Sequence, residues 1–142
     1  MIRVFTDASV IIASIISPTG ASCELLKRHT YGEIQLIINR YVLLEAKRNL
    51  KLKSPNNVGT VDMLVDLLAL DIVEVKPETV REVSAYTEMK DAPVVAGAIK
   101  GECQYLLTYD KKHLLNKPKI ATHSGLIIAT PGDLLQSLHE DG

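Results

Sequence analysis

The 142-residue chain lacks tryptophan and contains one phenylalanine and five tyrosines. This scarcity of aromatic side chains argues against modules that bind nucleic acids by stacking bases on aromatic platforms. Cysteine is also rare, because only Cys23 and Cys103 occur, and neither has a second cysteine or a histidine at metal-ligand spacing. We therefore expect neither a disulfide framework nor a zinc-binding motif, and both cysteines are interpreted as reduced packing residues.

Long apolar runs and a strong net charge are absent as well. No stretch reaches the roughly eighteen apolar residues of a membrane-spanning helix, and the first residues show no signal-peptide pattern. We therefore expect a cytoplasmic protein with no membrane partner. The formal net charge is −1, so a nucleic acid would have to bind local basic patches. What the chain does have is 46% hydrophobic residues, enough for the core of one globular domain.

Apolar runs and helical periodicity alternate along the chain. Short runs rich in β-branched residues predict five strands, at residues 2–6, 34–38, 72–75, 105–108 and 126–129. An apolar helix is expected directly after Asp7, and further helical segments at 22–29, 40–53, 61–68, 78–88 and 92–100. This order predicts an α/β fold with a largely parallel sheet covered on both faces.

Proline, glycine and serine mark the expected turns. They gather at residues 18–20, at 54–59, at Pro77, and at Pro131 with Gly132. None of these stretches is long enough for a domain linker. The polar tail, residues 139–142, is expected to fray, and 116–124 is expected to be a loop.

Two acids follow predicted strands directly. Asp7 ends the run RVFTD, and Asp110 ends the run QYLLTYD. The carboxyl ends of parallel strands form the edge at which such sheets bind ligands. If the two strands lie side by side, the two carboxylates meet.

Two further acids lie at or within predicted helices. Asp91 comes directly before the segment APVVAGAIKG, and Glu45 is the single acid between Glu33 and Asp62. Three or four carboxylates gathered at one sheet edge would repel one another without a cation. Mg²⁺ or Mn²⁺ fits such oxygen ligands, and its water can attack a phosphodiester.

Purely structural roles remain open for the same residues. Asp7 and Asp91 are also typical helix N-caps, and Asp110 is a typical turn residue. Glu45 can pair with Arg48 one helical turn later. The hydroxyl groups near the acids have ordinary roles too, as helix-start and strand-end side chains; they belong to Ser9 and Thr108.

Basic residues concentrate in two segments that each hold one acid. Residues 40–53 contain five bases beside Glu45, and residues 110–119 contain four lysines beside Asp110. They are either solvated surface or contacts for a phosphate backbone. The candidates for backbone contacts are Lys47, Arg48, Lys51, Lys111 and Lys112.

Other chemistries find little support. None of the four histidines falls in a metal-binding or Ser-His-Asp pattern, and each is interpreted as a surface or loop residue. No G-x-G-x-x-G or Walker A sequence is present, which argues against dinucleotide or nucleoside triphosphate binding.

Three segments together resemble a known family. They read FTDASVIIASIISPTGASCELL, INRYVLLEAKRNL and KDAPVVAGAIKGECQYLLTYDKKHLL. Their order, with the first Asp, the helical Glu, D-x-x-x-x-A-x-A and T-x-D, resembles the PIN domain, the ribonuclease fold of VapC-type toxins. The resemblance covers nearly the whole chain and is strongest to the toxins with a Ser-Pro-Thr-Gly-like turn after the first helix.

The resemblance implies a single domain over residues 1–142 with a three-layer α/β/α fold and a parallel five-stranded sheet. It implies a Mg²⁺- or Mn²⁺-dependent endoribonuclease, the toxin of a toxin-antitoxin pair, with a cognate antitoxin and a homodimer or higher homo-oligomer as partners. Asp7, Asp91 and Asp110 would bind the metal, and Glu45 would activate water or bind a second ion. Thr108 matches the threonine of T-x-D, and Ser9 is placed with it at the substrate.

Two residues depart from the family pattern. Gln104 stands where we expect an aspartate, and Tyr109 stands where we expect a glycine. The first change would lower the negative charge near the metal, and the second would narrow the approach to it. These changes motivate the alternative of a catalytically silent PIN-like module that binds RNA or protein. A structure-specific DNA nuclease and a receiver-type phospho-acceptor are weaker alternatives, because inserted elements and a late-strand lysine are lacking.

Overall fold

The computed structural model describes residues 1–141 and the side chains of residues 1–140. Five strands form one parallel sheet in the order β3-β2-β1-β4-β5. Their bounds are β1 Ile2–Thr6, β2 Ile34–Asn39, β3 Asp71–Val73, β4 Tyr105–Leu107 and β5 Ile127–Ala129.

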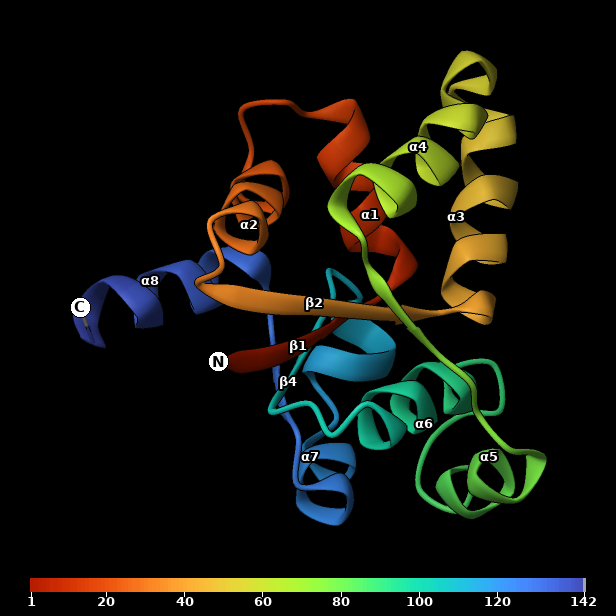
Figure 1. Ribbon diagram of the computed structural model, residues 1–142. Helices are drawn as coiled ribbons and strands as arrows, with labels where there is room; N and C mark the ends of the chain where they lie inside the picture. Colours follow the sequence, from red (N-terminus) through yellow and green to blue (C-terminus); the bar gives the residue numbers. More distant parts are fainter. Residues whose placement is uncertain (142) are drawn as a thin grey trace.

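Helices cover both faces of the sheet (Figure 1). One face carries α1 Ala8–Ile16, α2 Ala21–Thr30, α3 Arg40–Lys53, α4 Val58–Leu68 and α8 Pro131–Asp141. The other carries α5 Pro77–Val83, α6 Ala92–Lys100 and α7 Pro118–Ser124. This is the three-layer α/β/α fold with a parallel five-stranded sheet that the sequence predicted.

The central strands are buried on both sides. Phe5, Ile37 and Leu106, from β1, β2 and β4, are fully buried, which explains why these runs show no alternation of polar and apolar residues. Helix α6 lies close to this sheet because Gly97 has no side chain. A Cβ at Gly97 would lie 2.5 Å from Asn39 Nδ2 and 2.7 Å from the Phe5 ring.

Strand β3 is shifted from its expected position. Residues 72–75 were expected, whereas the strand runs over Asp71–Val73. Its pairing with β2 stops at Asn39, where β2 ends, so the next residues have no backbone partner on that side. The helix expected at 78–88 is also shorter, since α5 ends at Val83 and the chain then turns toward the carboxyl edge of the sheet.

Two helices were not predicted from the sequence. Helix α7 begins at Pro118 within the expected loop, and α8 begins at Pro131, which had been interpreted as a turn. Proline is favoured at the first helical position, where no N–H is needed. Reciprocal backbone-to-side-chain hydrogen bonds between Thr130 and Asp133 fix the start of α8. The tail expected to fray is helical through Asp141, and Gly142 lies outside the described residues.

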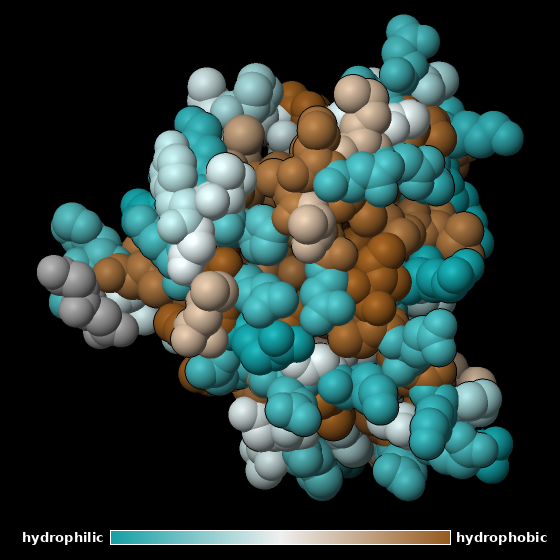
Figure 2. Space-filling model, in the orientation of Figure 1, coloured by the Kyte–Doolittle hydropathy of each residue, from teal (hydrophilic) through white to brown (hydrophobic). Residues whose placement is uncertain are grey.

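One surface is rich in exposed apolar side chains. Figure 2 shows them gathered over α4 and the segment that follows it toward β3. The exposed residues there include Met63, Leu67 and Ile72, and Leu44 of α3 is exposed as well.

Among residues 1–141, no single helix has both the length and the apolar character needed to cross a membrane. Helices α1 and α2 meet these criteria only as a pair, bent by 97°.

Candidate active site

The acids gather where the strand order changes direction. From β1 the chain adds β2 and β3 on one side, and β4 and β5 lie on the other. Strands β1 and β4 are neighbours, with Thr6 opposite Leu107, so Asp7 and Thr108 follow them at the same edge. The sequence left open whether these two strands lie side by side, and the structure shows that they do. Ligands of open parallel sheets bind at such a switch point.

The Asp7 carboxylate is held by three donors. Ala8 N donates to Oδ1 at 2.6 Å, and the hydroxyls of Thr108 and Ser9 donate to Oδ2 at 2.7 and 3.3 Å. Asp7 is therefore the N-cap of α1, as one interpretation expected, and it also faces the sheet edge. Burial raises the pKa of Asp7, the charge of Glu45 raises it further, and these three hydrogen bonds oppose the rise.

Asp110 is joined to both Thr108 and His113. Its N–H donates to Thr108 Oγ1 at 3.0 Å. Its carboxylate accepts from the N–H of His113 at 3.0 Å and lies 3.2 Å from His113 Nδ1. Asp110 therefore caps the short helical turn Lys111–Leu115, while its second oxygen orients an imidazole.

Asp91 differs from Asp7 and Asp110 because its side chain has no capping role. It precedes α6 but makes no side-chain cap hydrogen bond. Its side chain is buried, with the residue 8% exposed, and Oδ2 has no hydrogen-bond partner in the described part of the chain. Burial, with the charges of Asp110 and Asp7, raises the pKa of Asp91 to about 6, although Lys90 and His113 act in the opposite direction. Asp91 thus occupies the N-cap position of α6, as one interpretation expected, but its side chain does not act as the cap.

Glu45 approaches the cluster from α3 beside Tyr41. Burial raises the pKa of Tyr41 to about 12, and the charges of Glu45 and Asp91 add to this effect. The Tyr41 hydroxyl donates to the Lys90 carbonyl at 2.7 Å. Tyr41 thus ties the helix that carries Glu45 to the segment that carries Asp91. We call Asp7, Glu45, Asp91 and Asp110 the four-acid cluster.

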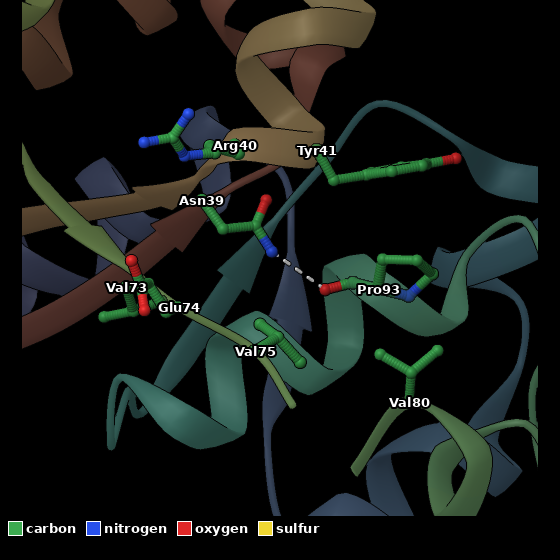
Figure 3. Close-up of a pocket in the computed structure, with 8 residues that line it drawn as sticks. All are labelled: Asn39, Arg40, Tyr41, Val73, Glu74, Val75, Val80 and Pro93. Atoms are coloured by element: carbon green, nitrogen blue, oxygen red, sulfur yellow. Dashed lines mark hydrogen bonds between the residues drawn. The ribbon is translucent and has the colours of Figure 1, made fainter. Parts of the chain in front are cut away.

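Asn39 connects α3 to α6, and the sequence interpretation did not identify it. Its Oδ1 accepts from Val42 N at 3.0 Å at the start of α3, and its Nδ2 donates to the Pro93 carbonyl at 3.0 Å in the first turn of α6. Figure 3 shows this bond across a cavity of about 340 Å³. An Asn directly before a helical run is an N-cap signal that was available in the sequence.

The cavity lies next to the four-acid cluster and is apolar on one side. Val73, Val75 and Val80 form its apolar wall, and Tyr41 with Pro93 borders it on the side of α3 and α6 (Figure 3). Arg40, Asn39 and Glu74 supply polar groups. Such a mixture of apolar wall and few polar groups is typical of small-ligand sites.

His113 is the residue that the sequence interpretation misjudged most. It had been assigned a surface or loop role, but it contacts Asp110, and its Nε2 lies 3.5 Å from Glu88 Oε2. Glu88, Asp91 and His113 each offer a ligand atom within 4.8 Å of the others. Glu88 and His113 are far apart in the sequence, so no spacing pattern indicated their contact.

The basic candidates do not all lie at this edge. Lys111 and Lys112 are exposed directly after Asp110. On α3, Lys47 is two residues from Glu45, about 200° around the helix, and it binds Asp62 of α4 at 2.7 Å. Arg48, one turn after Glu45, is close enough to Tyr41 to lower its pKa. Lys51 is exposed further along α3.

Gln104 lies at the opposite edge of the sheet. It precedes β4, and its Oε1 accepts from Arg3 N at 2.7 Å. Thr108 lies four residue steps further along the extended chain, about 13 Å away. The expected loss of negative charge near the metal is therefore wrong for this position. Tyr109 lies by the acids, and its hydroxyl is 2.9 Å from Ser22 Oγ on α2.

The three-layer fold and its acidic switch point define an α/β protein with carboxylates gathered at the carboxyl edge of a parallel sheet. The PIN domain model matches residues 3–112, most of the chain, and the protein belongs to the PIN domain family. Members of this family are generally nucleases. None of the curated proteins matches the chain in sequence.

Two solved structures resemble the fold at low sequence identity. A chain in the crystal structure of VapBC2 from Rickettsia felis, bound to a DNA fragment from its promoter, is 15% identical with a TM-score of 0.64, over 89% of this chain and 97% of that one. PAE2754 from Pyrobaculum aerophilum is 16% identical with a TM-score of 0.61, over 98% of both chains. Both support the three-layer fold.

Proposed function

We propose that this protein is a divalent-metal-dependent endoribonuclease. The observation that carries this proposal is the Asp91 carboxylate, which is buried beside Asp7 and Asp110 and has one oxygen without a partner. Burial of an unpaired carboxylate costs stability, so its retention favours a cationic ligand. The donors are carboxylate oxygens, which fit a hard cation such as Mg²⁺ or Mn²⁺.

Each acid would have a separate task. Asp7, Asp91 and Asp110 would hold the cation, directly or through water. When bound, a divalent cation polarises water and offsets the charge that develops on the phosphate. Glu45 would accept the proton of the attacking water. Thr108 and Ser9 act as positioning residues, because their hydroxyls fix the Asp7 carboxylate.

RNA would lie along the carboxyl edge of the sheet. Exposed lysines beside Asp110, with Arg48 and Lys51 on α3, would bind its phosphates, and this binding would weaken with salt. Lys47 was predicted to share this task, and its ion pair with Asp62 makes it the weakest candidate. The cavity beside Tyr41 offers room for a base of the substrate.

We infer further that the protein is the toxin of a toxin-antitoxin pair. The structural similarity to a chain of VapBC2 supports this inference. The exposed apolar surface over α4 (Figure 2) favours a protein partner, an antitoxin or a second copy of the chain. Multi-angle light scattering of the purified chain would establish its oligomeric state.

The proposal is tested by cleavage of a fluorescent single-stranded RNA with Mg²⁺, Mn²⁺ or EDTA. Wild type is compared with Asp7→Asn and Asp91→Asn, prepared identically. Asp66→Asn is the matched control, since Asp66 is an exposed acid on α4. We expect metal-dependent cleavage in wild type and in the control, and its loss in the two site variants.

Equal cleavage by wild type and Asp7→Asn would indicate a contaminating nuclease and would overturn the assignment. Absence of cleavage with every ion, together with absence of Mn²⁺ binding by calorimetry, would support the silent binding module instead. Gln104 no longer favours that module, because it lies at the opposite edge of the sheet.

A further inference from the structure

A histidine and an acid from outside the four-acid cluster meet one of its members, Asp91, at its rim. Glu88 and Asp91 lie in the segment between α5 and α6, and His113 lies in the helical turn after β4. Their ligand atoms are within 4.8 Å of one another. Only Asp91 belongs to the four-acid cluster. We call Glu88, Asp91 and His113 the histidine triad.

The ring of His113 is oriented as metal-binding imidazoles usually are. Its Nδ1 lies 3.2 Å from Asp110 Oδ2, and its Nε2 faces Glu88 at 3.5 Å. A ligating histidine commonly donates one ring N–H to a carboxylate and keeps the other nitrogen for the metal. Nδ1 therefore lies within 3.2 Å of both the Asp110 carboxylate and the Lys90 ammonium, while Nε2 lies on the side of Glu88.

Asp91, which the triad shares with the four-acid cluster, has an oxygen available for a ligand. Its Oδ2 is buried without a hydrogen-bond partner among the described residues, and the residue is 8% exposed. The exposed Lys90 places its ammonium 3.2 Å from His113 Nδ1. The Lys90 ammonium therefore lies at the ring nitrogen that faces Asp110, and Nε2 is the nitrogen that a cation in the triad would bind.

The donor set of the triad differs from that of the four-acid cluster. Four carboxylates suit hard cations such as Mg²⁺, whereas imidazole with carboxylates suits borderline ions such as Zn²⁺. Zinc accepts such mixed nitrogen and oxygen ligands and leaves one position for water.

We propose that Glu88, Asp91 and His113 form a second cation site that prefers Zn²⁺ to Mg²⁺. Because Asp91 is shared, an ion in this site draws that carboxylate away from the four-acid cluster and adds a second positive charge close to it. Zinc therefore inhibits Mg²⁺-dependent cleavage. The binding site rests on the triad alone, whereas the inhibition rests on the proposed nuclease function.

Binding is measured first, on the full chain after removal of metals with EDTA. Zn²⁺ is titrated by calorimetry, and Co²⁺ serves as a spectroscopic probe of nitrogen ligation. We expect one ion per chain, with affinity at least about tenfold weaker in His113→Gln and in Glu88→Gln. The matched controls are His139→Gln and Glu78→Gln, exposed residues on α8 and α5 that should leave affinity unchanged. Thermal melts confirm that each variant is folded.

Asp7→Asn separates this site from the nuclease centre. It should abolish cleavage while it leaves Zn²⁺ affinity within about threefold of wild type, since Asp7 is outside the triad. Unchanged Zn²⁺ affinity in both triad variants would overturn the proposal, and so would an equal loss in Asp7→Asn and Glu88→Gln. If only the nuclease proposal fails, the result can be distinguished from failure of the zinc site. Zn²⁺ would still bind to the triad, but no ion would support cleavage.

Inhibition is measured by adding Zn²⁺ to the Mg²⁺ cleavage assay. Wild type should lose activity as the triad fills, and Glu88→Gln should retain activity at Zn²⁺ concentrations about tenfold higher. Equal inhibition of wild type and Glu88→Gln would show that Zn²⁺ acts elsewhere.

Discussion

The two edges of the sheet use charge in opposite ways. At the edge where the strands begin, Arg3 donates to the Gly101 carbonyl at 2.7 Å and to Gln35 at 3.2 Å, and it lies 3.5 Å from Asp71. Gln104 accepts the Arg3 backbone N–H. Positive and negative groups are paired here, and the network ties neighbouring strands together.

At the edge where the strands end, carboxylates face carboxylates. Burial and neighbouring acids raise the pKa values of Asp7 and Asp91, and one Asp91 oxygen has no partner in the described chain. The first edge has the composition of a structural network, whereas the second leaves a buried carboxylate oxygen unpaired among the described residues. Both edges contain polar residues, so polar composition does not distinguish them. A buried charge without a partner therefore identifies the candidate site better.

The strongest test of this contrast is Asp91→Asn. We expect cleavage to fall on the order of 10³-fold, because a cation-binding carboxylate is lost. Without metal, the variant should be more stable than wild type by about 2 kcal/mol, because a buried unpaired charge is removed. Melts in EDTA should then show a rise in Tm of about 5–8 °C.

Asp66→Asn is the control for both measurements and should change neither. Lower stability of Asp91→Asn in EDTA would mean that Asp91 supports the fold and would break the contrast between the edges.

Arg3→Met should lower stability and leave cleavage nearly unchanged, the reverse of Asp91→Asn. The Gly101 carbonyl and Gln35 lose their donor, so we expect a loss of about 2 kcal/mol in the free energy of unfolding. The ion pair with Asp71 adds little because both side chains are partly exposed. Urea denaturation measures the loss. Cleavage by the folded variant should stay within about twofold of wild type, and a large loss of kcat at full folding would contradict a structural role.

The pH dependence of stability should sharpen the contrast further. The pKa of Asp91 is raised from 3.8 to about 6, so folding favours its protonated form. The resulting destabilisation is present above pH 6 and disappears as the pH falls toward 4. The Tm advantage of Asp91→Asn should therefore be largest near pH 7 and small near pH 4.5, in EDTA. An advantage that does not depend on pH would exclude charge as its cause.

The smallest expected effect concerns the lysines. Replacing Lys111 and Lys112 together by alanine should raise KM several-fold. It should also reduce the slope of log K for RNA binding against log salt concentration by about one for each phosphate contact that is lost. Lys47→Ala is the matched comparison, because its ammonium is already paired with Asp62. Fluorescence anisotropy at several salt concentrations gives both slopes. Equal slopes in the two variants would place the RNA elsewhere.

Much of this organisation could be predicted from the sequence, for physical reasons. Continuous apolar runs identified the buried strands, and an acid directly after such a run identified Asp7 and Asp110 as edge residues. Their adjacency depends on strand order, which spacing alone does not give. The resemblance to the PIN family implied a parallel five-stranded sheet without a strand order, and the structure shows the order β3-β2-β1-β4-β5.

The remainder depended on tertiary contacts. His113 and Glu88 meet only because the segment after α5 turns back toward the turn after β4. Gln104 was placed by family alignment near the metal, whereas strand geometry puts it at the far edge with Arg3. Helices α7 and α8 were missed because a proline that starts a helix looks like one that ends it.

The pairing of β1 with β4 has a consequence for synthesis of the protein. The bond from Thr108 to Asp7 joins residues 101 positions apart, and the central strand is made among the first residues of the chain. A ribosome must therefore produce most of the chain before β1 acquires its second neighbour. A nascent chain that ends before residue 105 holds Asp7, Glu45 and Asp91 but lacks the strand that brings them together with Asp110. The four-acid cluster is therefore complete only after β4 and Asp110 have been made.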